Sequence, residues 1–217
     1  ARDMRNRSAR QDIIKAIEDK EPLVRFHAIS AMEQLPADQR IALLIPALTD
    51  PVRAVRIAAA SGTTRARVSG LSDEERDALE RASKEQREFL DQNADFASGQ
   101  RNLAIHFEKS GQQEKAESAY RRALEIDNRD TASRINLAHL LYSQKKYQEA
   151  VEQFKEAIKY EPEFGAAYYS LGLLWAELKD YKKAEHYLSE AAVRMPGNER
   201  VLKNLDAVRF YLRNPSR

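Results

Sequence analysis

Four histidines and many carboxylates are the side chains of this sequence that could carry acid–base or metal chemistry. The histidines are His27, His106, His139 and His186, and none has a second ligand at a metal-binding spacing. The carboxylates lie on the polar faces of expected helices, where a close pair would be a coincidence of solvated surfaces. Phosphate loops, nucleophile elbows and His-Glu-x-x-His motifs do not occur in the sequence. We therefore expect no enzyme, no metal and no cofactor.

Composition favours a helical protein and excludes several other classes. Charged residues make up 32% of the 217 positions and glycine only 7 of them, which suits solvated helices better than sheets. The absence of cysteine excludes disulfides, thiolate metal sites and covalent haem attachment within these residues. A net charge of +2 is too small for a general polyanion binder. Arg2, Arg5, Arg7 and Arg10 nevertheless leave nucleic-acid binding through this Arg-rich N-terminal region as an alternative.

The sequence leaves the compartment open. No stretch approaches the roughly 20 apolar residues that span a bilayer, so we expect a soluble protein without membrane insertion. No signal peptide is visible, and the first residue is Ala1 rather than Met, which suggests a processed product or a piece of a longer protein. The bacterial periplasm is favoured over the cytoplasm, and the oligomeric state is undetermined.

A 34-residue repeat organises the second half of the chain. The aligned positions alternate between small residues and large apolar ones, as expected where two helices approach closely and larger side chains fill the space around the contact. The aligned sets are Leu103, Leu137 and Leu171; Ala104, Ala138 and Gly172; Phe107, Leu141 and Trp175; Ala116, Ala150 and Ala184; Tyr120, Phe154 and Leu188; and Ala123, Ala157 and Ala191.

This pattern resembles the tetratricopeptide repeat over residues 97–213. The resemblance implies an all-α fold, a right-handed solenoid of antiparallel helix pairs whose concave groove binds a protein or peptide. The family usually has a large residue three places before the first leucine of each unit. Only Tyr168 conforms to this, and Gln100 and Arg134 at the same place weaken the expected packing of the first two units.

The segment from Glu199 to Arg213 reads as one amphipathic helix that caps the array. Its predicted apolar stripe consists of Leu202, Leu205, Val208 and Leu212.

A weaker repeat of 31 residues precedes the first. Asp19 aligns with Asp50, and Val24-Arg25 aligns with Val55-Arg56. The phrase from Asp50 to Arg56 resembles the interhelix turn of HEAT repeats. That resemblance implies that the Asp accepts hydrogen bonds at the start of the second helix and that the Arg reaches an acid of the neighbouring repeat.

The 31-residue repeat predicts two helical pairs, residues 9–35 and 38–61. Their expected inner faces are Ile13, Ile14, Ile17, Val24, Ile29 and Met32 in the first pair, and Ile41, Leu44, Ile45, Leu48, Val55 and Ala59 in the second.

A capping box at Ser72 and Glu75 predicts the start of a long polar helix. We expect it to run from about residue 73 to about residue 92, with Leu79, Phe89 and Leu90 as its apolar contacts. The predicted organisation is therefore HEAT-like repeats over residues 1–67, a linker helix over 68–95 and tetratricopeptide units with a capping helix over 96–217.

The tetratricopeptide resemblance also implies a peptide-binding groove. Transferring the family's groove positions residue by residue gives Arg101, Ile105, Asn136, His139, Tyr142, Tyr169, Leu173 and Lys203. Such a mixture supplies donors for carbonyls or a carboxylate together with flat rings that offer contact area. Arg101 and Asn136 match the clamp of chaperone-binding members, but Ile105, Ala166 and Ser170 depart from it, so an internal peptide segment is the favoured ligand.

We interpret the sequence as a protein–protein interaction module with a scaffold or assembly role. A narrower alternative comes from its layout: HEAT-like pairs, a charged helix ending near Asn93-Ala94-Asp95 and a tetratricopeptide tail resemble the C-terminal part of bacterial multihaem cytochrome c proteins. That alternative makes the chain the haem-free docking portion of a periplasmic electron-transfer protein.

Overall fold

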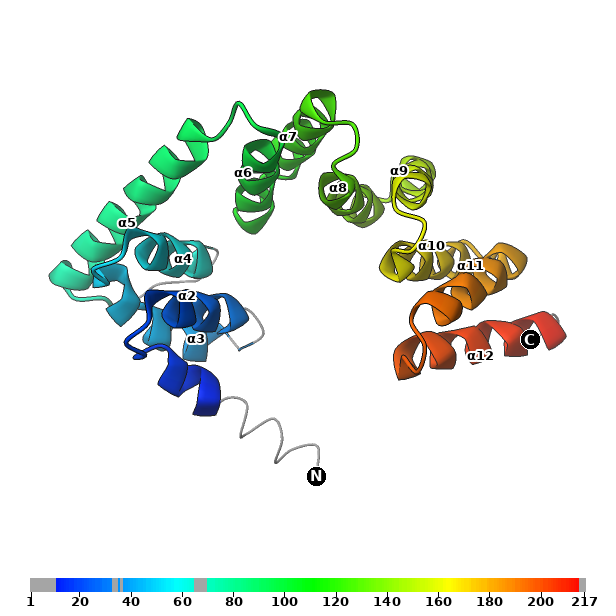
Figure 1. Ribbon diagram of the computed structural model, residues 1–217, viewed down its shortest axis with the longest axis horizontal. Helices are drawn as coiled ribbons and strands as arrows, with labels where there is room; N and C mark the ends of the chain where they lie inside the picture. Colours follow the sequence, from blue (N-terminus) through cyan, green and yellow to red (C-terminus); the bar gives the residue numbers. More distant parts are fainter. Residues whose placement is uncertain (1–10, 33–34, 36, 65–69, 215–217) are drawn as a thin grey trace. The chain divides into compact units, whose positions relative to one another are not determined.

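The computed structural model describes residues 11–32, 35, 37–64 and 70–214, and these residues form helices without a strand (Figure 1). The predicted all-α fold is confirmed. Contacts divide the chain into two compact units, which we call unit 1 (Ala1–Ala94 and Ile105–Gln112) and unit 2 (Asp95–Ala104 and Gln113–Arg217). The predicted domain limits stay predictions, because this division also places residues 105–112 in unit 1.

Unit 1 is a stack of short helices closed by one long helix. Residues 11–16 are helical, and α2 (Pro22–Ala31), α3 (Ala37–Leu44), the 3-10 turn η2 (Pro46–Thr49), α4 (Arg53–Thr63) and α5 (Asp73–Gln92) follow. Pro46 separates α3 from η2, because proline lacks an N–H and clashes with the preceding turn. The capping box is formed: Ser72 Oγ accepts from Glu75 N at 3.2 Å and Glu75 Oε2 from Ser72 N at 2.8 Å.

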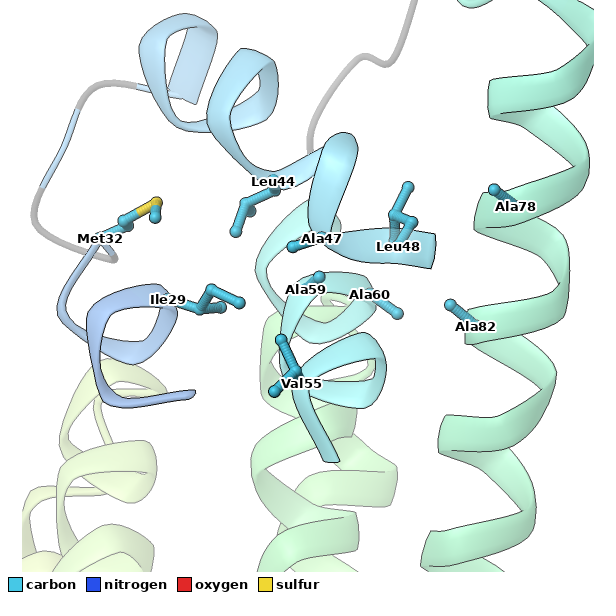
Figure 2. Packing of buried hydrophobic residues seen from close by; sticks show 10 residues of the cluster. All are labelled: Ile29, Met32, Leu44, Ala47, Leu48, Val55, Ala59, Ala60, Ala78 and Ala82. Atoms are coloured by element: carbon cyan, nitrogen blue, oxygen red, sulfur yellow. The ribbon is translucent and has the colours of Figure 1, made fainter. Parts of the chain in front are cut away.

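The core of unit 1 joins α2, η2, α4 and α5. Figure 2 shows Ile29 of α2 beside Val55 of α4, with Leu48 of η2 facing Ala78 and Ala82 of α5. Two alanines one helical turn apart let α5 pack closely against this core. The long helix is therefore part of unit 1 rather than a free spacer.

Three predicted core positions of unit 1 are wrong. Ile14 and Val24 are exposed: Ile14 borders an open pocket that it shares with Leu43 and Pro46, and Val24 lies outside the buried stripe of α2, which is Ala28 and Ile29. Phe89 is exposed as well, since the buried stripe of α5 runs through Ala78, Ala82 and Leu90 instead.

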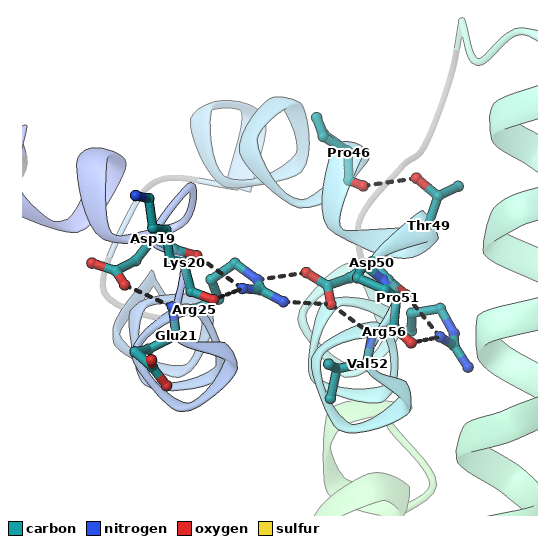
Figure 3. A network of polar contacts seen from close by, with 10 residues as sticks. All are labelled: Asp19, Lys20, Glu21, Arg25, Pro46, Thr49, Asp50, Pro51, Val52 and Arg56. Carbon is teal, nitrogen blue, oxygen red and sulfur yellow. Dashed lines mark hydrogen bonds and ion pairs between the residues drawn. The ribbon is translucent and has the colours of Figure 1, made fainter.

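A chain of arginine contacts ties the turns of unit 1 together (Figure 3). Arg25 donates to both carboxylate oxygens of Asp50, at 2.7 and 3.0 Å, and its Nη1 donates to the carbonyls of Asp19 and Lys20. The contact that the HEAT resemblance implied, from arginine to the next repeat's acid, is thus present.

The contact repeats 31 residues later. Arg56 donates to the carbonyls of Asp50 and Pro51, at 2.7 and 3.1 Å, and to both carboxylate oxygens of Glu85 on α5. The hydrogen bonds from Arg25 and Arg56 lower the pKa of Asp50 and of Glu85, respectively. We call this series the arginine ladder.

Unit 2 keeps the 34-residue period in its helix boundaries. The first helices of the repeats are α6 (Ala97–Lys109), α8 (Thr131–Ser143), α10 (Gly165–Glu177) and α12 (Glu199–Arg213), and the second helices are α7 (Gln113–Ile126), α9 (Tyr147–Tyr160) and α11 (Tyr181–Arg194). Successive first helices begin 34 residues apart, and so do successive second helices.

The turns inside the pairs repeat as well. Gly111, Lys145 and Lys179 occupy the same place and all have positive φ, at 75°, 62° and 60°. In each turn the next residue's N–H bonds back to a carbonyl five positions earlier, the pattern of a left-handed helix C-cap. The two lysines adopt a conformation that normally favours glycine, so the packing of the helices imposes the turn.

Small residues set the distance between paired helices. Ala116, Ala150 and Ala184 are fully buried, as predicted. At Gly172 a Cβ atom would lie 2.8 Å from Leu188 Cγ and 3.1 Å from the Leu188 backbone nitrogen. The pair α10–α11 therefore packs at a separation that only glycine permits without a shift.

Arg134, which the pattern marked as a weak packing position, is nearly buried and takes part in a repeated contact. Its guanidinium lies 5.4 Å from the Tyr160 ring centroid, and Nη2 donates to the carbonyl of Asn128 at 2.6 Å. In the next unit the two residue types exchange helices: Arg194 lies 4.0 Å from the Tyr168 ring and donates to the carbonyl of Pro162. The two carbonyls are themselves 34 residues apart.

The helix α12 differs from the other first helices at the small position. Asp206 stands in register with Ala138 and Gly172, and an exposed carboxylate there does not suit a close second helix. The buried stripe of α12 is Val201, Leu205 and Val208 with Leu212 half-buried. The prediction for Leu202 is wrong, since 45% of it is exposed.

Acid should weaken unit 1 through Asp50. A depressed folded-state pKa means that the Arg25–Asp50 contact stabilises the fold above the unfolded pKa of about 4 and loses this effect as pH falls through the folded value. We expect Asp50→Asn to be less stable than wild type at pH about 6, with the difference shrinking below about pH 4. Urea unfolding across this range tests it, and a difference independent of pH would contradict it.

The exchange of arginine and tyrosine between the two units predicts that a double substitution at Arg134 and Tyr160 restores stability that each single substitution loses. Arg134→Tyr alone and Tyr160→Arg alone should each lower the free energy of unfolding by about 1–2 kcal/mol, because each breaks a cation–π contact and the first also removes the donor to Asn128. Together they recreate the arrangement of Tyr168 and Arg194, so the double variant should regain at least half of the summed loss in urea unfolding. Additive losses would show that the two arrangements are not equivalent.

Candidate functional site

The predicted groove residues lie on the first helices of the repeats. His139 and Leu173 hold one register position of α8 and α10, and Tyr169 and Lys203 hold another on α10 and α12. Equal positions on successive helices face the same way in a regular array. We call Asn136, His139, Tyr142, Tyr169, Leu173 and Lys203 the first-helix face.

Arg101 has a partner inside unit 2. Its Nη1 lies 2.7 and 2.5 Å from the two carboxylate oxygens of Asp130. Asp130 also caps α8, accepting from Ser133 N at 3.2 Å and from Ser133 Oγ at 2.5 Å. Arg101 thus holds the start of α8, and a role in ligand binding stays a prediction for it.

Ile105 differs from the other predicted residues in its unit. It is half-buried on α6 and belongs by its contacts to unit 1.

Tyr142 meets an acid that the sequence analysis did not single out. Its hydroxyl donates a short hydrogen bond to Glu177 Oε2, and the Tyr147 hydroxyl donates to Oε1 of the same carboxylate at 3.4 Å. The bond to Glu177 raises the pKa of Tyr142, so this phenol stays a neutral donor at ordinary pH. Glu177 lies four residues after Leu173, and this helical spacing was the signal that could have found it.

Tyr169 is also held by a residue that sequence reasoning missed. Asn204 Nδ2 of α12 donates to the Tyr169 hydroxyl oxygen at 2.7 Å. Asn204 stands two periods after Asn136, so the 34-residue register contained the signal. The bond fixes the tyrosine ring against the capping helix.

The remaining residues of the face are available for contact. The His139 ring packs edge-on against Phe154 at 5.1 Å, and desolvation there lowers its pKa, which keeps it neutral near pH 7. Leu173 is 37% exposed. Among the described residues, Asn136 and Lys203 have no hydrogen-bond or ion-pair partner for their side chains. The face therefore offers neutral polar, aromatic and aliphatic groups with one cation.

Neither a metal centre nor a membrane-spanning helix is found in the described part of the chain. No three His, Asp or Glu residues converge there as metal ligands would. No described helix combines the length and the apolar character that crossing a bilayer requires.

Family models match three segments of the chain. A HEAT repeat model matches residues 1–62, and tetratricopeptide repeat models match residues 102–130 and 135–199. The chain carries HEAT and tetratricopeptide repeats. The arginines of the ladder lie in the HEAT segment, and its last acid, Glu85, lies beyond it. The tetratricopeptide segments contain most of the first-helix face.

A relative of known identity is similar to part of the chain. The type IV pilus assembly protein PilF of Pseudomonas aeruginosa is 30% identical over 132 residues, which are 60% of this chain and 52% of PilF. The chain thus spans about half the length of this curated relative.

Solved structures show the same fold. A structure of Pseudomonas aeruginosa PilF has a TM-score of 0.57 at 24% identity, over 75% of this chain and 69% of that one. A crystal structure of MamA has a TM-score of 0.54 at 18% identity, over 65% and 80% of the two chains. The first tetratricopeptide domain of Spaghetti (RPAP3), bound to the HSP90 peptide SRMEEVD, has a TM-score of 0.52 at 18% identity, over 55% and 94%. The likeness to multihaem cytochromes stays a prediction.

The Arg101–Asp130 pair predicts a stability effect that distinguishes Arg101 from the residues of the first-helix face. Arg101→Ala should lower the free energy of unfolding by about 1–3 kcal/mol, because it removes a charge-assisted bond to a buried carboxylate. Lys203→Ala, which removes an exposed cation, should change it by less than about 0.5 kcal/mol. Urea unfolding measures both, and equal effects would show that Asp130 does not need Arg101.

Proposed function

We propose that the chain is a protein-interaction module whose first-helix face binds an extended segment of a partner protein. The observation that carries the proposal is the contrast within this face. Tyr142 and Tyr169 are fixed by Glu177 and Asn204, while Asn136 and Leu173 are left without a bonded partner. Fixed rings beside free contact groups suit binding, since little side-chain entropy is lost when a ligand arrives.

The chemistry of the face favours a peptide segment over a small metabolite. The Asn136 amide can both donate to and accept from a peptide backbone. Leu173 and the tyrosine rings offer places for apolar side chains of the ligand. His139 is neutral and adds no charge. A face spread over α8, α10 and α12 suits a long ligand that contacts several repeats.

The comparisons support this class of function. The RPAP3 domain is bound to a peptide, and PilF is a pilus assembly protein. We propose for this chain only what these proteins have in common, which is recognition of a segment of another protein in an assembly or scaffold role. The same inference favours a polypeptide over nucleic acid as the partner.

Selection from random peptides displayed on phage tests the proposal without knowledge of the natural partner. Peptides selected on the full chain should bind Asn136→Ala and Leu173→Ser about 5–30-fold more weakly, which corresponds to about 1–2 kcal/mol. Val193→Ser on α11, at a residue that is 75% exposed, is the matched control and should leave binding unchanged.

Thermal melts of all three variants show whether the fold is kept. Recognition would lie elsewhere on the chain if the selected peptides bound the two face variants as tightly as wild type. The same would follow if they failed to bind the Val193→Ser control.

A further inference from the structure

Tyr142, Tyr147 and Glu177 meet inside the tetratricopeptide array, and we call them the acid–aromatic cluster. They come from three successive helices, α8, α9 and α10. Both phenols donate to the Glu177 carboxylate, one to each oxygen, and the two ring centroids lie 5.9 Å apart at an interplanar angle of 51°. Tyr142 and Glu177 are exposed, and Tyr147 is half-buried. Two aromatic rings thus lie beside an accessible carboxylate.

Glu177 has no cationic partner among the described residues. The groups bonded to it are neutral phenols, which leave its negative charge uncompensated. Lys146, close to the cluster in sequence, is paired instead with Glu117 at 2.7 Å. Lys145 and Lys179 are exposed and form no ion pair within the described part of the chain.

The same array shows how a cation can complete such a cluster. The Arg194 guanidinium lies 4.0 Å from the Tyr168 ring centroid, and its Nη1 donates to Glu190 Oε2 at 2.7 Å. One cation thus contacts an aromatic face and a carboxylate together. Both contacts attract it, because the face of an aromatic ring is electrostatically negative and a carboxylate accepts charge-assisted hydrogen bonds.

A second example uses lysine and tryptophan. Lys183 Nζ lies 4.1 Å from the Trp175 ring centroid and 2.6 Å from Asp180 Oδ2. Ring, acid and cation occur together in both examples. The acid–aromatic cluster has the ring and the acid, and among the described residues it lacks the cation.

We propose that the acid–aromatic cluster binds an arginine side chain of the segment that the first-helix face recognises, an inference that rests on the proposed function. Tyr142 belongs to that face, so a ligand lying along it reaches the cluster. Arginine fits better than lysine, because a planar guanidinium can stack on a tyrosine ring while its N–H groups bond the carboxylate, as in the first example. The ligand then places a positive charge at Glu177 and an apolar side chain at Leu173, one helical turn earlier on α10.

Nα-acetylarginine N-methylamide is the first probe, because it carries the side chain without any other feature of a partner. NMR spectra of the full chain with ring-labelled tyrosine should show saturable shifts of Tyr142 and Tyr147, with a Kd of about 10–50 mM, as a few weak contacts allow. The citrulline counterpart is neutral and nearly identical in shape, so it should cause no saturable shift. The lysine counterpart should bind more weakly than the arginine probe.

Variants of the full chain locate the site. Glu177→Gln should abolish the saturable shifts, although its amide can still accept from one phenol and donate to the other. Glu161→Gln, at an exposed acid between α9 and α10, is the matched control and should leave the shifts unchanged. Thermal melts of both variants show whether the fold is kept.

Peptides selected on the full chain test whether the partner segment uses the cluster. Those that depend on Asn136 and Leu173 should contain an arginine. Replacing this arginine by citrulline should weaken binding to the wild-type chain at least about tenfold, but binding to Glu177→Gln less than about twofold, because the two changes remove the same contact.

Three results with the small probes would overturn the proposal. They are no saturable shift with the arginine probe, equal binding of the citrulline or lysine probe, and binding that Glu177→Gln leaves unchanged. Peptides that depend on the first-helix face but bind without an arginine would overturn it as well, and would leave the proposed function intact. If instead no selected peptide depends on Asn136 or Leu173, the proposed function fails, and the arginine probe alone decides whether the cluster binds an arginine side chain.

Discussion

Close approach of two helices at a small residue is the constraint on which the tetratricopeptide array depends. At Gly172 there is no room for a Cβ atom against Leu188. Once that separation is fixed, the tight turn must follow, and Lys179 accepts a left-handed conformation to make it. The next first helix then begins 34 residues after the last, which places equal positions on one side. The exposed Asp206 of α12 departs from the small residues at this position.

Arginine contacts to turn carbonyls recur in both kinds of repeat. Arg25 and Arg56 hold the carbonyls of their own turns in the HEAT segment, and Arg134 and Arg194 hold loop carbonyls in the tetratricopeptide array. Helix ends leave carbonyls without intrahelical partners, and a guanidinium has enough donors to bond them and a second group together. The second group is an acid in one segment and a tyrosine ring in the other. One residue type thus joins local capping to packing between neighbouring helices.

The roles of the predicted groove residues follow from these restraints. Arg101 is used to hold Asp130, and the two tyrosines are oriented by Glu177 and Asn204. What stays available is a short series of neutral groups and one cation, Lys203, whose positions are set by rigid helices rather than loops. A scaffold of this kind can recognise a segment without reorganising, and specificity then rests on which groups lie at each register position.

The sequence by itself determined the repeats, the ends of α5 and α12, the capping box at Ser72 and the buried alanines, because these depend on periodicity and local hydrogen bonds. It did not determine which apolar residues are covered: Ile14, Val24 and Leu202 have the right type and spacing for a core but are exposed. Periodicity names a face of a helix, whereas burial requires another element against that face. The partners of Arg101 and Arg134 were likewise decided by tertiary structure, since their side chains reach Asp130, 29 positions away, and Tyr160 on the next helix, beyond any local rule.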